Sequence, residues 1–373
     1  MSRSFLLLGL IPLLSLGCDP GPTVDDTDQV GTDDSDTVDT DTTGGDTDGG
    51  EDTSGDTASL PIDWPATPAD YEFDDTTYLA AFRVPGAGTC CRDWGAMSKD
   101  NVVAGTNKID NALSGLAGLL NPFGINVQDQ LDYTIESGAF VGLLEHHDHP
   151  IGDGTYNMAF FMGAFEGATD FVAADAGTGT FTVLPENFVG ATGEPTVFFR
   201  NTTVTNSHLS AKGGHFAISL PLLDGITLTV PVDDVQIEAE VDTSTGGMAL
   251  NDGELSGYIT QDSIFTAYND LVNSQCSCLG LTGDIFTKPA GGDWSQHCVA
   301  AAADLCLAAD ETICVALGGS KLAQGGYCST MFGFMPLLAD IDTDADPSKY
   351  EALSVGLRMQ GVPGTIVGVT PQP

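Results

Sequence analysis

The sequence predicts an α+β protein with an antiparallel, β-rich core, folded as a sandwich or a curved half-barrel and carrying a disulfide-rich helical cap. Two observations predict the core. Apolar and polar side chains alternate through much of residues 131–259, and the expected strands are close enough in sequence to pair antiparallel. A third observation predicts the cap, because six of the nine cysteines fall within residues 276–328, alongside an Ala-rich helical pattern.

The expected strands follow this period of two. They cover residues 77–84, 131–144, 158–165, 179–184, 196–204, 216–222, 226–232, 235–241, 254–259 and 353–359. The alternation is cleanest on either side of Asp233 and Asp234, so these two residues are expected to form a tight turn between two strands. Gly356 and Gly361 disfavour a helix for the last run, which is therefore assigned as a strand.

Helical spacing of apolar residues predicts the helices. They cover residues 106–121, 263–273, 295–309 and 311–317. Thr106 or Asn107 is the expected cap of the first helix, and Pro122 ends it. The last two helices form the Ala-rich part of the expected cap.

Composition divides the chain into three parts. Residues 1–17 are typical of a secretory signal peptide, because Arg3 precedes an apolar run that is too short to span a bilayer. Residues 18–58 are rich in Asp and Thr, have little to bury, and are expected to be a disordered acidic spacer. Residues 59–373 are expected to form one folded domain, mainly β over 59–262, with the helical cap over 263–339 and a calcium loop and terminal strand over 340–373.

The end of the signal peptide, Leu13-Leu14-Ser15-Leu16-Gly17-Cys18, resembles a bacterial lipobox. Together with the spacer, it resembles the class of exported bacterial lipoproteins, whose members are mostly uncharacterised. The resemblance implies a lipid anchor on Cys18 and a place on the cell envelope, at the outer membrane or the cell surface, with the choice of membrane left open. The alternative is ordinary signal-peptidase cleavage, because Ser15 and Gly17 also satisfy a small-x-small rule.

The charge of the chain restricts its partners. With 11 basic and 53 acidic residues, the formal net charge is −42 at pH 7. Such a charge excludes a nucleic-acid binder of the usual electrostatic kind and disfavours adsorption on anionic lipid. Cations are the expected small partners, and the expected contact with a membrane is through the lipid anchor.

Eight cysteines remain once Cys18 is set aside, and an even number in an exported chain indicates disulfides. They are Cys90, Cys91, Cys276, Cys278, Cys298, Cys306, Cys314 and Cys328. Adjacent cysteines seldom bond each other, so Cys90 and Cys91 are each expected to pair with a distant cysteine. Four disulfides are expected, and the 105 possible pairings stay open.

The most specific ligand spacing in the chain lies in residues 340–351. Oxygen ligands fall at positions 1, 3, 5, 7, 9 and 12 of a 12-residue loop, on Asp340, Asp342, Asp344, Asp346, Ser348 and Glu351. The spacing resembles the loops of EF-hand and dockerin-like proteins, which implies a bound Ca²⁺ as a structural cofactor. Ala345 replaces the usual position-6 Gly, and Pro347 removes the position-8 amide. The alternative is an acidic, solvated turn.

A second candidate metal site is the run from Glu145 to His149, which contains half of the six histidines. On a strand, Glu145, His147 and His149 would share one face, while His146 and Asp148 would share the other. Zinc catalysis needs about three ligands and an open position. The alternative is a set of structural or adventitious histidines at a strand end.

The sequence contains no Gly-x-Ser-x-Gly, His-Glu-x-x-His or complete Ser-x-x-Lys motif set, so an enzymatic activity is left open and not favoured. The first functional hypothesis is a membrane-anchored envelope or cell-surface lipoprotein, a calcium-stabilised binding or structural module for an unidentified envelope or extracellular ligand. One alternative is a secreted hydrolase or metalloenzyme that uses residues 146–149. Another is a lipid-binding carrier, because an amphipathic helix is followed by long curved strands.

Overall fold

The structure is a computed structural model of the chain. It describes residues 62–86, 88–99, 109–120, 126–149, 152–223, 226–244, 246–275, 284, 286–288, 295–296, 338–344 and 349–370. Contacts divide the chain into two units, Met1–Thr57 and Ala58–Pro373, and all described residues belong to the second unit. The predicted signal peptide, Cys18 and the predicted spacer therefore lie outside the described residues.

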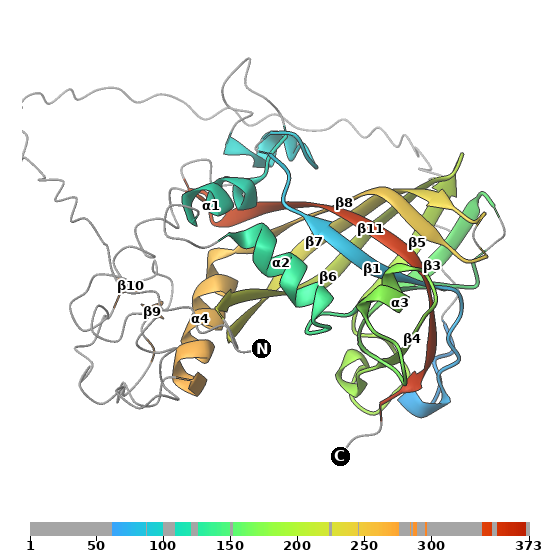
Figure 1. The fold of residues 1–373 in the computed structure, drawn as a ribbon. Helices are drawn as coiled ribbons and strands as arrows, with labels where there is room; N and C mark the ends of the chain where they lie inside the picture. The colour runs from blue at the N-terminus through green and yellow to red at the C-terminus, as the bar shows by residue number, and fades with distance from the viewer. Residues whose placement is uncertain are drawn as a thin grey trace, which may run out of the picture. The chain divides into compact units, whose positions relative to one another are not determined.

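Eight strands form a closed antiparallel barrel (Figure 1). They are β1 (Thr76–Arg83), β2 (Gly142–His147), β3 (Gly154–Phe165), β5 (Phe198–Thr205), β6 (His208–Leu223), β7 (Ile226–Asp242), β8 (Ala249–Thr260) and β11 (Ala352–Val369). Each pairs antiparallel with the next, and β11 pairs with both β8 and β1. The predicted sandwich or curved half-barrel is therefore wrong. The 18-residue strand β11 is long enough to join both edges of the sheet, which leaves no open edge among these eight strands.

A ninth strand, β4 (Gly179–Val183), pairs antiparallel with β3 and parallel with β11. It follows the short helix α3 (Phe171–Asp175). Asp170 caps the start of this helix, because its side chain accepts a hydrogen bond from the backbone N–H of Ala173. The ring of Phe181 on β4 stacks on Tyr78 of β1 at 5.1 Å between centroids. This strand therefore covers the outer face of β1.

Every second residue of each barrel strand points into the interior of the barrel. Ala211, Ile237, Leu255 and Leu357 lie opposite one another across β6, β7, β8 and β11, and all four are buried. The other row of these strands carries charged side chains that reach solvent, such as Arg358. This inside/outside alternation is what a closed barrel with a solvated outer face requires.

On β1, β2 and β3 both rows are buried, because other parts of the chain cover the outer row. Phe161 of β3 contacts Tyr71, which precedes β1, and also Phe188, which follows the short helix η5 (Pro185–Asn187). The inner row of the same strands includes Thr77 and His146. A residue of the outer row here is as thoroughly buried as one inside the barrel.

Among the described residues, three longer helices accompany the barrel. Helix α1 (Ala112–Leu120) contacts β11 and confirms the predicted first helix from Ala112 onward. Residues 109–111, which the prediction included, are not helical, and Asp110 instead forms an antiparallel bridge with Arg92. Helix α4 (Gln261–Gln275) contacts β7 and β8 and confirms the helix predicted at residues 263–273. Helix α2 (Val127–Glu136) contacts both β1 and β6, which lie on opposite sides of the barrel, so α2 crosses one barrel end. Short 3₁₀ turns lie at η1 (Pro68–Asp70) and η2 (Gly95–Met97).

Helix α2 overturns the first half of the strand predicted at residues 131–144. The Asn126 side chain accepts from the backbone N–H groups of Gln128 and Asp129 and begins the helix. Leu131 and Ile135 then lie one turn apart on its buried face. Only the last three residues of the predicted strand, 142–144, are extended, as the start of β2.

The predicted turn at Asp233 and Asp234 is also wrong, because β7 runs through both residues. Pairing with β6 continues on both sides, and the irregularity is absorbed by a bulge in which Asp234 has a φ of 47°. Two local strand patterns therefore belong to one long strand.

No helical cap is evident in the described part of the chain. The predicted helix at residues 295–309 is wrong at its start, because Ser295–Gln296 form β10, which pairs with β9 (Phe286–Thr287). Strand pairing here prevails over a local helical preference. Residues 297–337, which carry most of the predicted cap, lie outside the described residues. So do the six cysteines assigned to it.

Candidate metal sites

Glu145 lies on the outer face of β2 and is completely buried. Thr76 pairs with Glu145 across β1 and β2, which brings the segment before β1 against this carboxylate. The Tyr71 hydroxyl donates to Glu145 Oε2 at 3.3 Å, and the backbone N–H of Asp74 donates to Oε1 at 3.2 Å. Burial raises the pKa of Glu145, and the neighbouring His147 opposes that rise.

His147 and Asp74 form a three-residue cluster with Glu145. His147 Nδ1 lies 3.5 Å from Glu145 Oε1 and 3.5 Å from Asp74 Oδ2, and it is buried without a hydrogen-bond partner. One potential ligand atom from each residue lies within 4.8 Å of the other two. The Glu145 carboxylate raises the pKa of His147. One nitrogen and two carboxylates form a donor set suited to zinc and related ions.

The strand alternation correctly placed Glu145 and His147 on one face, but His146 and His149 do not join them. His146 points into the barrel, where Nε2 is 2.9 Å from Thr77 Oγ1 and Nδ1 is 2.9 Å from the Tyr156 hydroxyl. Burial lowers the pKa of His146 to about 3, so it is neutral at pH 7. Strand β2 ends at His147, and the ring of His149 packs edge-on against Tyr156. Both histidines belong to a separate cluster around Tyr156, in which His146 is completely buried and His149 is partly exposed.

Asp74 is the cluster residue that the sequence analysis missed. It lies 71 positions before Glu145, and only the pairing of β1 with β2 brings it into place. No local spacing in the sequence signals that approach. A pocket of about 460 Å³ lies next to the cluster, and its lining includes Asp74, His146 and His149 but neither Glu145 nor His147.

The predicted calcium loop is partly described, and three of its acidic residues converge. One carboxylate oxygen each from Asp342, Asp344 and Glu351 lies within 4.8 Å of the other two. The Asp344 backbone N–H donates to Asp342 Oδ1 at 3.1 Å, and that of Thr343 donates to Glu351 Oε2 at 3.3 Å. Glu351 Oε1 is buried without a hydrogen-bond partner. Burial raises the pKa of Glu351, and the two aspartates raise it further.

The first residue of the loop, Asp340, is held elsewhere. Its Oδ1 accepts from the backbone N–H of Ser354 at 2.7 Å, and its Oδ2 accepts from the Ser354 hydroxyl. Burial raises the pKa of Asp340 to about 6. Asp346 and Ser348 lie outside the described residues. The described part of the loop therefore presents three of the six predicted ligands together.

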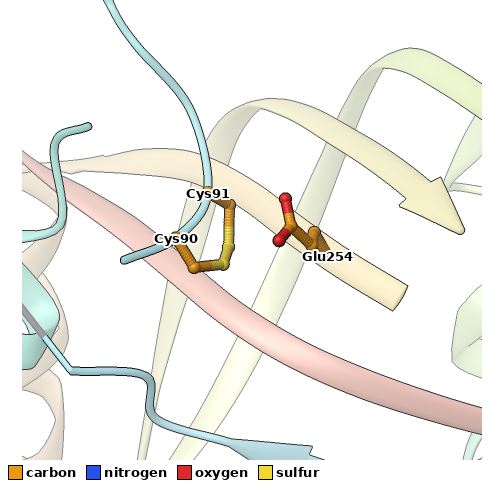
Figure 2. A group of neighbouring side chains, drawn as sticks. All are labelled: Cys90, Cys91 and Glu254. Atoms are coloured by element: carbon orange, nitrogen blue, oxygen red, sulfur yellow. A yellow bond between two sulfur atoms is a disulfide. The ribbon is translucent and has the colours of Figure 1, made fainter. Parts of the chain in front are cut away.

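Cys90 and Cys91 form a disulfide with each other, whereas the sequence analysis expected a distant partner for each. Figure 2 shows the Glu254 carboxylate beside this pair. Metals bind cysteine as a thiolate, so the bonded sulfurs offer no strong ligand here. This third group is therefore set aside as a metal site.

No protein-family model, curated protein or solved structure matches this chain. In the described residues, no helix combines the length and the apolar character that crossing a bilayer demands. The described residues form a closed antiparallel barrel with two clusters of potential metal ligands. The functional argument rests on the residues of those clusters.

Proposed function

We propose that this chain is an exported lipoprotein, anchored to the cell envelope through Cys18, whose barrel domain is a calcium-stabilised binding or structural module. The lipobox-like run before Cys18 and the acidic spacer support the anchor. The observation that carries the calcium assignment is the convergence of Asp342, Asp344 and Glu351. These residues occupy positions 3, 5 and 12 of the spacing noted in the sequence.

The chemistry of this loop favours calcium. All three groups are carboxylates, the hard oxygen ligands that Ca²⁺ takes at about 2.3–2.6 Å, so ligand oxygens on one ion lie up to about 5 Å apart. One oxygen from each of the three residues lies within 4.8 Å of the other two, which is compatible with a shared calcium ion. Without a cation, three carboxylates repel one another, and the buried Glu351 Oε1 has no hydrogen-bond donor. A bound cation relieves both costs.

The position of the loop links calcium to the stability of the barrel. Ile341 pairs with Ala352, the first residue of β11, and the backbone N–H of Gln261 donates to the Glu351 carbonyl at 2.8 Å. Strand β11 closes the barrel by joining β8 to β1. Calcium therefore acts at the start of the closing strand, and we expect it to raise the free energy of unfolding.

The other two functional hypotheses receive less support. Buried side chains such as Ile237 and Leu255 fill the barrel interior in the described strands, which disfavours a lipid carrier. The separation of His146 and His149 from Glu145 and His147 removes the four-residue cluster on which the hydrolase hypothesis depended. A binding or structural module is the function that remains best supported.

Thermal unfolding of the detergent-solubilised, full-length chain tests the calcium assignment. We expect a higher midpoint in calcium than in chelator for the wild type, and no difference for Glu351→Gln. Glu166→Gln is the matched control, because Glu166 is exposed and uses its backbone groups for its described hydrogen bonds. A wild-type midpoint that is equal in calcium and chelator, or a full calcium response in Glu351→Gln, would overturn the assignment.

A further inference from the structure

We propose that Asp74, Glu145 and His147 bind one divalent transition-metal ion of the zinc class, at a site separate from the calcium loop. The site differs from the loop in its chemistry, because it offers an imidazole nitrogen with two carboxylates. It also differs from the metal site considered from the sequence, because Asp74 replaces His146 and His149. The proposal is independent of the proposed calcium-dependent function.

The distances match the coordination shell of a small ion. With bonds of about 2.1 Å, two ligands of a tetrahedral ion lie about 3.4 Å apart. His147 Nδ1 is 3.5 Å from an oxygen of Glu145 and 3.5 Å from an oxygen of Asp74. Good N–H···O hydrogen bonds are shorter, at about 2.7–3.2 Å, and this buried nitrogen has no hydrogen-bond partner. An ion held by all three residues explains why the atoms approach without bonding one another.

Neighbouring groups orient each proposed ligand. Oε1 of Glu145 accepts from the Asp74 backbone N–H, and Oε2 accepts from the Tyr71 hydroxyl. The Asp148 backbone N–H donates to Asp74 Oδ2 at 2.9 Å. On the far side of the imidazole, Asp148 Oδ2 lies 3.6 Å from His147 Nε2. A carboxylate beside the second ring nitrogen is a common outer partner of a metal-bound histidine.

The charges around the site also favour a cation. Glu145 is completely buried, and its only ion-pair partner among the described residues is His147. Asp74 adds a second carboxylate, so even a protonated His147 leaves a net negative charge. A divalent ion would neutralise both carboxylates with His147 neutral. Asp74 keeps 44% of its side chain exposed, which leaves a path from solvent to the site.

His208 provides a matched control elsewhere on the barrel. It also lies between two carboxylates, but Glu240 is 3.0 Å from Nδ1 and Glu238 is 2.8 Å from Nε2. Both ring nitrogens are hydrogen-bonded, and they point away from each other, so these three residues cannot place one ligand atom each around a single ion. A change at His208 removes a histidine and its acidic contacts without touching the proposed site.

The test is a Co²⁺ titration of chelator-stripped, full-length chain, with calcium present to occupy the loop. Cobalt reports tetrahedral coordination through its visible absorption. We expect one Co²⁺ per chain, displaced by Zn²⁺, and an affinity at least about tenfold lower in His147→Gln and in Asp74→Asn. Both side chains are partly exposed, and circular dichroism checks that both variants fold. His208→Gln should bind as the wild type does.

A wild type that gives no tetrahedral cobalt spectrum, or a His147→Gln variant that binds with unchanged affinity, would overturn the proposal. A second measurement uses the wild type alone. Zn²⁺ should protect His147 from acylation by diethyl pyrocarbonate, read by mass spectrometry, while His208 stays reactive. Equal reactivity of His147 with and without Zn²⁺ would also contradict the site.

Discussion

Ser354 donates two hydrogen bonds to Asp340, one from its backbone N–H to Oδ1 at 2.7 Å and one from its hydroxyl to Oδ2. Both carboxylate oxygens of Asp340 are thus held by β11. The loop spacing alone assigns Asp340 to position 1 of a calcium shell. The structure instead directs it to the barrel strand and leaves Asp342, Asp344 and Glu351 as the converging group.

This arrangement predicts different outcomes for two substitutions in the loop. Asp340→Asn retains an oxygen for the Ser354 backbone N–H, and we expect it to keep most of the calcium-induced rise in unfolding midpoint. Glu351→Gln removes a converging carboxylate and should abolish that rise. Differential scanning calorimetry in calcium and in chelator compares them. Loss of the calcium response in Asp340→Asn would show that Asp340 turns into the loop when calcium binds.

The partly buried Asp340 also predicts a pH dependence in chelator. Burial raises its pKa to about 6, and the nearby Asp110 carboxylate adds to the rise, so the folded state disfavours the ionised form. The free energy of unfolding should be highest below the unfolded pKa of 3.8 and should fall as the pH rises towards 6. The difference between the folded pKa of about 6 and the unfolded pKa of 3.8 lowers the free energy of unfolding by about 3 kcal/mol, at about 1.4 kcal/mol per pKa unit.

Denaturant unfolding at pH 4 and pH 7.5 measures this effect. Asparagine cannot ionise, so the free energy of unfolding of Asp340→Asn should lack this loss. Relative to the wild type, the variant should therefore be about 3 kcal/mol more stable at pH 7.5 than it is at pH 4. If the free energies of unfolding of the wild type and Asp340→Asn differ by the same amount at both pH values, the pKa of Asp340 is not raised in the folded state.

Inside the barrel, His146 and Tyr156 should be energetically coupled. Thr77 Oγ1 donates to the Met248 carbonyl at 2.8 Å, so His146 Nε2–H donates to Thr77 and Nδ1 accepts from the Tyr156 hydroxyl. His146→Leu would leave that hydroxyl buried without an acceptor, at a cost of about 1–3 kcal/mol.

A double-mutant cycle with Tyr156→Phe checks the pair. Because the second change removes the orphaned hydroxyl, the double variant should be more stable than the sum of the single effects implies, by about 1 kcal/mol. Strict additivity of the two substitutions would show that the two side chains do not share a hydrogen bond.

The lipid anchor is tested by Cys18→Ala. Cys18 is the proposed acylation site, and Ser15 and Gly17 remain available for ordinary signal-peptidase cleavage. We expect the wild type in the detergent-extracted membrane fraction and the variant in the soluble fraction. If the variant stays with the membrane, something other than Cys18 anchors the chain.

Local patterns in the sequence predicted much of the sheet but not how it closes. The alternation around Ile237 identified a strand correctly, because inward and outward positions of a barrel wall differ in polarity as those of a sandwich do. Closure depends on β11 reaching both β1 and β8, which is a long-range pairing. For the same reason, the local pattern at Asp233 and Asp234 predicted a turn where pairing with β6 and β8 keeps the strand continuous.

At the candidate sites too, local patterns predicted which residues lie on one strand face or in one loop, but not which distant residues contact them. Alternation placed Glu145 and His147 on one face of β2, and the spacing of the loop brought Asp342, Asp344 and Glu351 under consideration together. Tertiary contacts decided the rest. Asp74 joins Glu145 only through strand pairing, and Asp340 leaves the loop because Ser354 of β11 binds it.

Isothermal titration of Ca²⁺ into the chelator-stripped, full-length chain tests the central claim most directly. The account predicts one calcium ion per chain with a dissociation constant on the order of 10⁻⁴ M or lower, unchanged in His147→Gln and lost in Glu351→Gln. No saturable calcium binding by the wild type, or binding that survives Glu351→Gln unchanged, would contradict it.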